Sequence, residues 1–319
     1  MMRYLRPLLA APLLVLGLTL TSAPAGADSV FGVSISIPGG NAGLIVTSCV
    51  SAKNCVAAGI TSTAKVWFVT QTNGRLGAVT LRTLPAGTTE IYSGVRPSDT
   101  GPESLSCSSL THCVALFSND VHTVPKNSQL LYFSMTNGTW GNFQTVTGFP
   151  QASAQGARPI GSVICMTATS CTIYGDFHIA PYESWTVFAA TVNAATVGTP
   201  FLFPASAYDG DDEYYGAIGC VASANWCVVS GQVDGLTSGT GRYAFVGTIT
   251  AGVPSNLSTL AAPAGFNGHS QMLKPTSITC TSVNNCTMTG SWTNDSGAPL
   301  HQFRATLTNG NWSVPVRTS

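Results

Sequence analysis

A pair of cysteines recurs five times along this chain, and this repeat constrains the fold more than any other feature. The first cysteine of each pair stands at position 49, 107, 165, 220 or 280, so the steps between pairs are 58, 58, 55 and 60 residues. All ten cysteines belong to a pair. The pairs are Cys49 and Cys55, Cys107 and Cys113, Cys165 and Cys171, Cys220 and Cys227, and Cys280 and Cys286. A fixed period of this length indicates a propeller or a solenoid.

Other short motifs keep the same period. An apolar run lies on each side of every pair, a phenylalanine follows, and Thr-Asn-Gly turns occur at positions 72–74, 136–138 and 308–310. Asn-Gly between apolar runs predicts a tight hairpin, because both residues tolerate a positive φ. The recurring phenylalanines are Phe68, Phe133, Phe188, Phe245 and Phe303. A fourth run then leads to a proline, as in "TLPAG" and "GFPQA".

Each unit therefore reads as four short strands joined by tight turns. After the N-terminal leader, no stretch keeps a 3.6-residue periodicity over a helical length. Four antiparallel strands per repeat are typical of a propeller blade, so we expect an all-β, five-bladed β-propeller with four antiparallel strands per blade. A β-solenoid and a pair of sandwiches are the alternatives. Solenoid coils are usually shorter than this repeat, and sandwiches lack so regular a spacing.

The N-terminus has the pattern of a secretory signal peptide. Arg3 and Arg6 precede an apolar core at positions 8–20, which is short for a membrane span, and Ala27 ends a small-residue cleavage motif. We expect a cleaved signal peptide at residues 1–27 and a single secreted, extracellular propeller domain at residues 28–319. An uncleaved membrane anchor is the alternative.

In an oxidising compartment, an even number of paired cysteines predicts disulfides. Each pair flanks the expected turn between the first two strands of a blade, where cross-strand neighbours lie close enough to bond. We therefore expect one local disulfide per blade. A zinc site is the alternative, but structural zinc sites usually have closer cysteine spacing and add histidine, and only His112 lies inside a pair. A redox pair would be expected to show Cys-x-x-Cys.

The charge of the exported chain excludes two classes of partner. Without Arg3 and Arg6, 11 basic residues face 13 acidic ones, and the basic residues are not clustered. Nucleic acids and anionic membrane surfaces both require clustered Lys and Arg. We therefore expect no nucleic acid partner, no membrane contact after cleavage, and a monomer whose partner is an extracellular glycan or protein.

Two segments could complete the last blade. Residues 34–40, "SISIPGG", resemble the fourth-strand ends of other units and precede the first cysteine pair, so they are candidates to pair with the last blade. The C-terminal "WSVPVRTS" could instead supply that outer strand itself. Closing a ring matters because it removes exposed sheet edges.

The repeat as a whole resembles a known family. "CVSAKNCVAAG" with a following Phe, Thr-Asn-Gly and Trp ("MTNGTW", "LTNGNW") resembles the Cys-pair repeats of secreted actinobacterial proteins, which are related to the Asp-box repeats of sialidase-like propellers. The resemblance covers nearly the whole exported chain and implies a propeller. It does not imply sialidase activity, because the Asp-box is degraded here. No motif groups the arginines Arg96, Arg158, Arg242 and Arg304 into the triad such an enzyme needs.

The long loops of such a propeller share one face and are the expected place for a ligand, by analogy with other propellers. Most acidic residues fall in these loops, as do His122, His178, His269 and His301. Charges also collect in loops simply because strands exclude them, and that explanation stays open. The candidate ligand-binding residues are Glu103, Asp120, Asp176, His178, Tyr208, Asp209, Asp211, Asp212, Glu213, Tyr214, Tyr215 and Asp234.

The densest of these candidates form "YDGDDEYYG" at positions 208–216. Alternating carboxylates at Asp209, Asp211 and Glu213 match the start of a calcium loop, but the glycine at the sixth position and the glutamate at the twelfth are missing. A solvated acidic loop is the alternative to calcium, and we expect no other cofactor and no metal site. Tyrosines beside carboxylates also suit sugar binding.

Two functions remain open. One is a binding or interaction module without catalysis. The other is a carbohydrate-active hydrolase or lyase, which would need two suitably spaced carboxylates, with Asp176, Glu103, Asp120, Asp234 and Glu213 as candidates. The sequence shows no nucleophilic serine motif, zinc-protease motif or phosphate loop.

Overall fold

A computed structural model describes most of the chain after residue 27. It covers residues 28–40, 45–61, 63, 65–84, 102–119, 129–149, 160–179, 184–193, 196–203, 213–234, 242–266, 271–294 and 297–318. Strands dominate these ranges, and their one helical element is a 3-10 turn, η1, at Ala222–Ala224. No helix among them is long and apolar enough to cross a membrane.

Five consecutive segments of the chain repeat one strand order, and we number them repeats one to five. Each begins with a first strand: β3 (Val46–Ser51), β8 (Pro102–Ser109), β13 (Ile160–Cys165), β18 (Glu213–Val221) and β23 (Gln271–Ser282). The second strands are β4 (Asn54–Ile60), β9 (His112–Asn119), β14 (Ser170–Ile179), β19 (Trp226–Asp234) and β24 (Asn285–Asn294). The third strands are β5 (Lys65–Thr72), β10 (Gln129–Thr136), β15 (Ser184–Asn193), β20 (Arg242–Thr250) and β25 (Pro299–Thr308).

The fourth strand of every repeat is split into two short pieces, where the sequence pattern predicts one. The pieces are β6 (Arg75–Leu76) and β7 (Thr80–Thr83), β11 (Thr139–Trp140) and β12 (Gln144–Thr145), β16 (Thr196–Val197) and β17 (Phe201–Leu202), β21 (Val253–Pro254) and β22 (Ser258–Thr259), and β26 (Asn311–Trp312) and β27 (Val316–Arg317). Both pieces pair with the third strand. At the break, a backbone N–H still reaches that strand, as from Gly77 to Thr70 and from Ser313 to Thr306 at 2.8 Å.

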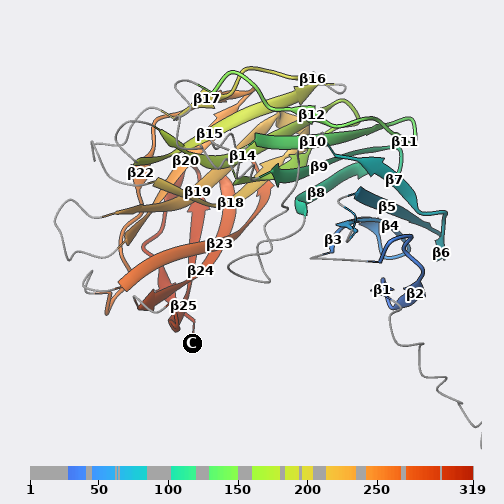
Figure 1. Cartoon of the computed structure of the whole chain (residues 1–319). Coiled ribbons are helices and arrows are strands. Elements are labelled where there is room, and N and C mark those ends of the chain that lie inside the picture. The colour runs from blue at the N-terminus through green and yellow to red at the C-terminus, as the bar shows by residue number, and fades with distance from the viewer. Residues whose placement is uncertain are drawn as a thin grey trace, which may run out of the picture. The chain divides into compact units, whose positions relative to one another are not determined.

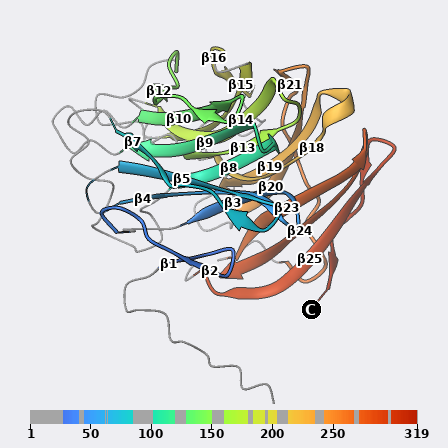
Figure 2. The same ribbon diagram turned by 90° about the vertical axis from the view of Figure 1, so that its right-hand side faces the viewer.

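All pairings within a repeat are antiparallel, and the strands lie in the order first, second, third, outer. The first strands of neighbouring repeats contact each other from β3 through β8, β13 and β18 to β23. Figure 1 shows the repeats following one another in chain order, from blue to red, and Figure 2 gives the same succession from the side. One parallel bridge, Arg242 to Met272, joins repeats four and five into a single sheet.

The predicted turns are confirmed at the junction of the third strand and the outer pair. Asn73, Asn137 and Asn309 have φ of 51°, and the glycine after each is also positive. Repeat four uses Ala251 and Gly252 in the same conformation, with φ of 51° and 82°. This fourth turn carries no Asn-Gly signal in the sequence, and an alanine there is strained because its Cβ crowds the backbone.

All five predicted disulfides are present, one in each repeat. The two cysteines of each pair are direct cross-strand partners on the first and second strands, with Cα atoms 3.9 to 4.0 Å apart. Free cysteines are absent. The local pairing and the position at the first turn are therefore confirmed.

The core consists of apolar seams between neighbouring repeats. Repeats one and two share a cluster that includes Phe68 and Phe133. Three further clusters join repeats two and three, three and four, and four and five. The tryptophan of the "TNGTW" turn, Trp140, stacks on Phe68 of the preceding repeat with ring centroids 3.8 Å apart. Arg82 of repeat one also donates to the Trp140 carbonyl oxygen, so this turn is structural.

The recurring phenylalanines do not all occupy one structural position. Phe188, Phe245 and Phe303 lie opposite glycines of the second strand, and in repeat one Trp67 takes that place, opposite Gly59. A Cβ on Gly59 would lie 2.4 Å from the Trp67 ring, so the ring fills the space that the missing side chain leaves. Phe68 and Phe133 lie opposite Ala58 and Ala115 instead. The sequence spacing does not reveal this one-residue difference in register, because the connection between the second and third strands differs in length from repeat to repeat.

At the N-terminus, β1 (Asp28–Val30) pairs with β2 (Val33–Ile35) in a hairpin that belongs to a small separate unit ending at Ser36. Everything from Ile37 to Ser319 forms the second unit. In repeat five, β27 pairs with β25, so the C-terminus supplies the outer strand. Within the first unit, Ser34 and Ile35 pair with Ser29 and Asp28.

Candidate functional site

The strands of every repeat have two ends of different character. We call the disulfide end the one with the turns between first and second strands and between third strand and outer pair. We call the loop end the one where first strands begin, second strands end and third strands begin. All five disulfides lie at the disulfide end, and the candidate residues in strands lie at or near the loop end.

Seven candidates fall on described strands. Glu103 is the second residue of β8, and Asp176 and His178 lie close to the end of β14. Glu213, Tyr214 and Tyr215 open β18, and Asp234 is the last residue of β19. In the strand register Glu213 lies opposite Val233, the residue before Asp234. Five candidates lie outside the described residues: Asp120, Tyr208, Asp209, Asp211 and Asp212.

Asp176 has the best-defined surroundings of these candidates. The residue is 1 % exposed, and its cross-strand partners are Ile160 and Val187. It shares a strand face with Tyr174, since residues two apart on a strand point the same way. The Tyr174 hydroxyl donates to the carbonyl oxygen of Ser230 in repeat four at 2.9 Å. Asp176 is therefore enclosed between repeats three and four.

Sequence reasoning missed two polar residues at the same level. Gln232 and Ser291, like Asp176, stand five residues after the second cysteine of their repeat, and both are buried. The Gln232 Nε2 atom has no hydrogen-bond partner among the described residues. A polar residue at one fixed offset in four repeats, with Ser118 in repeat two, was the available signal. Burying an amide or carboxyl group costs free energy unless the group is hydrogen-bonded. The sequence nevertheless keeps a polar residue at this position of the second strand.

Aromatic residues and histidines are also register partners at the loop end. In repeat three, His178 is the register partner of Trp185. In repeat five, Trp292 and His301 are partners, with ring centroids 4.8 Å apart at 71°. Trp292 is buried, and His301 is half-buried. An edge-to-face pair of this kind holds the histidine ring at a defined angle.

The acidic residues are concentrated at one end of the strands. Of the 13 Asp and Glu residues, 12 lie in the loop-end connections or on strand residues close to them, and the other is Asp28 in β1. Seven Lys and Arg residues share this end, which leaves a formal surplus of five negative charges. The turns at the disulfide end hold Lys53 and Arg75 but no acid.

Among the described residues, no group of three or more His, Cys, Asp or Glu side chains is placed to hold a metal ion. Asp209, Asp211 and Asp212 lie outside those residues, so the calcium loop stays a prediction. The described pocket with polar walls lies elsewhere, on repeat five near the disulfide end. Its lining consists of Thr279, Thr281, Asn285, Cys286, Thr287, Thr306, Leu307 and Thr308.

No protein-family model matches this sequence, and no curated protein matches it significantly. Solved structures do match. The α-L-arabinanase of Penicillium chrysogenum, complexed with arabinobiose, aligns with a TM-score of 0.52 and 10 % identity over 86 % of this chain and 80 % of its own. A polysaccharide lyase of family PL25, an ulvan lyase, aligns with a TM-score of 0.53 and 9 % identity over 83 % of this chain and 69 % of its own.

These two structures are β-propeller enzymes, and their likeness to this chain concerns the fold alone. A Hadza microbial sialidase also aligns, with a TM-score of 0.47 and 9 % identity over 82 % of this chain and 53 % of its own, which is too distant to carry an argument. The all-β, propeller-type fold predicted from the repeat is thus supported by structures of very different sequence.

Proposed function

We propose that this chain is an exported five-bladed β-propeller that binds a glycan at the loop end of its blades. Five repeats of one strand order, each with its own disulfide, support the blade number. The signal-peptide pattern at residues 1–27 and the five disulfides support export to an oxidising, extracellular compartment. The observation that carries the ligand proposal is the collection of carboxylates, histidines and aromatics at the loop end.

Sugars are recognised by two kinds of group that this end combines. Carboxylates accept hydrogen bonds from sugar hydroxyls, and flat aromatic rings cover the apolar faces of pyranoses. Asp234, Glu213 and the tyrosines beside Glu213 bring both kinds together in repeat four. The proposed site consists of Glu103, Asp120, Asp176, His178, Tyr208, Asp209, Asp211, Asp212, Glu213, Tyr214, Tyr215 and Asp234.

The electrostatics of this end select among glycans. A formal surplus of five negative charges repels uronic acids, sialic acids and sulfated sugars. Neutral polysaccharides and polymers of amino sugars meet no such repulsion, and amino groups are attracted. The ligand we propose is therefore a neutral or amino-sugar glycan, in contrast to the anionic polymer that the name ulvan lyase implies for that enzyme.

One observation favours a catalytic version of the same site. Asp176 is a buried carboxyl near the loop end, and burial of this kind suits a general acid in glycoside cleavage. The similar structures named as an arabinanase and a polysaccharide lyase also support a carbohydrate-active enzyme. A glycosidase would need a second carboxylate about 5 to 9.5 Å from the first, and Asp234 and Glu213 in the neighbouring repeat are the candidates.

A glycan array with the refolded exported chain tests the binding proposal, and a panel of chromogenic glycosides tests the catalytic one. Combined replacement of Asp211→Asn, Asp212→Asn and Glu213→Gln is expected to abolish binding to a neutral or amino-sugar hit. The matched control is Lys53→Gln at the disulfide end, which should bind normally. Turnover that Asp176→Asn abolishes would establish the enzyme. No hit in either screen would overturn the glycan proposal in favour of a protein ligand.

A further inference from the structure

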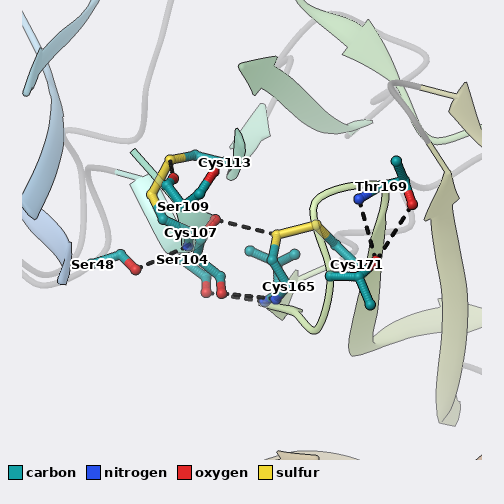
Figure 3. The surroundings of a disulfide bond; sticks show 11 residues. Ser48, Ser104, Cys107, Ser109, Cys113, Cys165, Thr169 and Cys171 are labelled. Carbon is teal, nitrogen blue, oxygen red and sulfur yellow. Dashed lines mark hydrogen bonds between the residues drawn. A yellow bond between two sulfur atoms is a disulfide. The ribbon is translucent and has the colours of Figure 1, made fainter. Parts of the chain in front are cut away.

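Serine hydroxyls join the first strands of repeats one, two and three. Cys107 N donates a hydrogen bond to Ser48 Oγ at 3.0 Å, where β8 contacts β3. One repeat further along the chain, Cys165 N donates to Ser106 Oγ at 2.8 Å. These first strands belong to separate sheets, so the hydroxyls take the place of a backbone ladder between them. Figure 3 shows the arrangement around the disulfide of repeat three.

The donors are N–H groups on the open edge of each first strand. The Cα atoms of Cys165 and Cys171 are 3.9 Å apart, which indicates a cross-strand pair without mutual hydrogen bonds. The N–H of Cys165 therefore points away from the second strand, as does the N–H two residues earlier, at Val163. Val163 N donates to Ser104 Oγ at 3.0 Å. Two hydroxyls of repeat two thus satisfy two edge amides of repeat three, as buried backbone groups require.

The first strand of repeat five, β23, carries the same two hydroxyls. Thr279 stands one residue before the first cysteine of its repeat, at the position of Ser106 in repeat two. Ser277 stands three residues before that cysteine, at the position of Ser104. Both residues of β23 are exposed, and no hydrogen bond in the described part of the chain engages either hydroxyl. Repeat five therefore presents two acceptors that its neighbour in the chain, repeat four, does not use.

The first strand of repeat one, β3, carries the complementary donors. The Cα atoms of Cys49 and Cys55 are 4.0 Å apart, so the N–H of Cys49 also points off the open edge. Thr47, two residues earlier, repeats the position of Val163. Both Thr47 and Cys49 are exposed, and within the described ranges no hydroxyl accepts from their N–H groups. The donors of repeat one and the acceptors of repeat five therefore match each other as those of repeats three and two do.

The face of repeat five that continues from these hydroxyls is polar. Thr287 and Thr306 are register partners and half-buried, and Thr289 and Arg304 are exposed. The equivalent of Thr287 in repeat four is Val228, which is buried in the apolar seam with repeat five. A seam with one polar face gains less free energy from the burial of apolar surface. Contact at this face therefore depends more on hydrogen bonds than the four apolar seams do.

We propose that β23 meets β3 of the same chain and closes the ring through these groups. Cys49 N donates to Thr279 Oγ1, and Thr47 N donates to the hydroxyl of Ser277. We call these two hydrogen bonds the clasp. They continue the series of contacts that runs from β3 through β8, β13 and β18 to β23.

The partner belongs to the same chain for two reasons. A series of like head-to-tail contacts returns to its start when the rotation closes, and this is the five-bladed fold proposed above. Tethering within one chain also gives β3 a high effective concentration at β23. The clasp thus rests on the proposed five-bladed fold but is independent of the proposed glycan.

A clasp of inner strands differs from closure by a shared outer strand. In repeat five, β27 already pairs with β25, so this repeat has its own outer strand. Closure is then left to the inner strands β3 and β23. Because the face of repeat five is polar, the seam between repeats five and one is the place where the ring opens most readily.

Hydrogen exchange of backbone amides, followed by NMR on 15N-labelled chain 28–319 without glycan, tests the clasp. We expect the amides of residues 47 and 49 to be protected like those of residues 163 and 165. Ser277→Ala combined with Thr279→Val should speed exchange at residues 47 and 49 about tenfold, as the loss of a hydrogen bond predicts. Exchange at residues 47 and 49 of the unaltered protein at the rate of an unstructured peptide would overturn the proposal, whatever a glycan array shows.

Ser106→Ala is the matched control, because it removes a hydroxyl of the same series between repeats two and three. It should speed exchange at Cys165 and leave residues 47 and 49 unchanged. Equal acceleration at residues 47 and 49 by both sets of substitutions would contradict a local clasp. Protection at these two residues should also be independent of protein concentration. Protection that disappears on dilution would overturn closure within one chain.

Discussion

The disulfide end and the loop end of the sheets differ in almost every property. At the disulfide end, turns of a few residues, five disulfides and positive-φ hairpins fix the strands, and no acidic residue occurs in the turns. At the loop end, the connections are long and carry nearly all of the acidic residues. The same strands therefore separate two tasks: one end holds the fold together, and the other is available to vary for binding.

This separation predicts where substitutions change stability. Replacing residues at the disulfide end should change the free energy of unfolding. We expect the largest effect from lost packing, a smaller one from a lost disulfide, and a smaller one again from backbone conformation. Four substitutions at this end test that ranking.

The largest effect is expected from Trp140→Ala. The Trp140 ring is 4 % exposed and stacks on Phe68 across the seam of repeats one and two. Truncating a buried tryptophan usually costs about 3 to 5 kcal/mol, and denaturant unfolding would measure it. Phe201→Ala is the matched control, since Phe201 is 48 % exposed on an outer strand. Equal losses for the two variants would contradict the packing role of the turn.

Removal of one disulfide should have the next largest effect. Replacing Cys107 and Cys113 by alanine opens a loop of seven residues, and chain entropy predicts a loss of about 2 kcal/mol in unfolding free energy. The pair Cys49 and Cys55 closes a loop of the same length, but Cys49 is exposed. Denaturant unfolding of both double variants separates entropy from packing. Equal losses indicate entropy, and a larger loss for the Cys107 variant indicates packing of this disulfide against the apolar cluster of repeats one and two.

The disulfide end was also the more predictable end from sequence. Cysteine spacing alone gave the correct partners and the correct turn, because a short loop on adjacent strands leaves no other geometry. Asn-Gly gave the hairpins for the same local reason. The split outer strands and the equivalence of Trp67 with Phe188 depend on how long strands pack on neighbours, which no local motif encodes.

The loop end was predictable only in composition. The concentration of acids was visible in sequence, but the enclosure of Asp176 between two repeats depends on the Tyr174 contact with Ser230, residues that belong to different repeats. Gln232 escaped notice because a single glutamine in a strand carries no pattern. The recurrence of a polar residue becomes visible only when the positions five residues after the second cysteine are compared across repeats.

A smaller effect, of opposite sign, is expected at the turn of repeat four. Ala251 holds a φ of 51°, a conformation that costs alanine more than asparagine. Ala251→Asn should therefore raise the unfolding free energy by up to about 1 kcal/mol. The mirror substitution, Asn137→Ala, has the same φ and should lower stability by a similar amount. If the unfolding free energies of both variants change in the same direction, backbone conformation at these turns does not determine their effect on stability.

The smallest effect should appear only as a dependence on pH. Burial lowers the pKa of His112, which lies at the start of β9, below its ordinary value of 6.5. Between the folded-state pKa and 6.5, the unfolded chain binds a proton that the folded chain does not, so stability falls as the pH falls through this window. His112→Gln should flatten this dependence in denaturant unfolding from pH 7 to pH 5. At pH 8 histidine is neutral in both states, so the difference between the two proteins there measures packing alone. An unchanged slope below pH 7 would show that other groups govern acid sensitivity at the disulfide end.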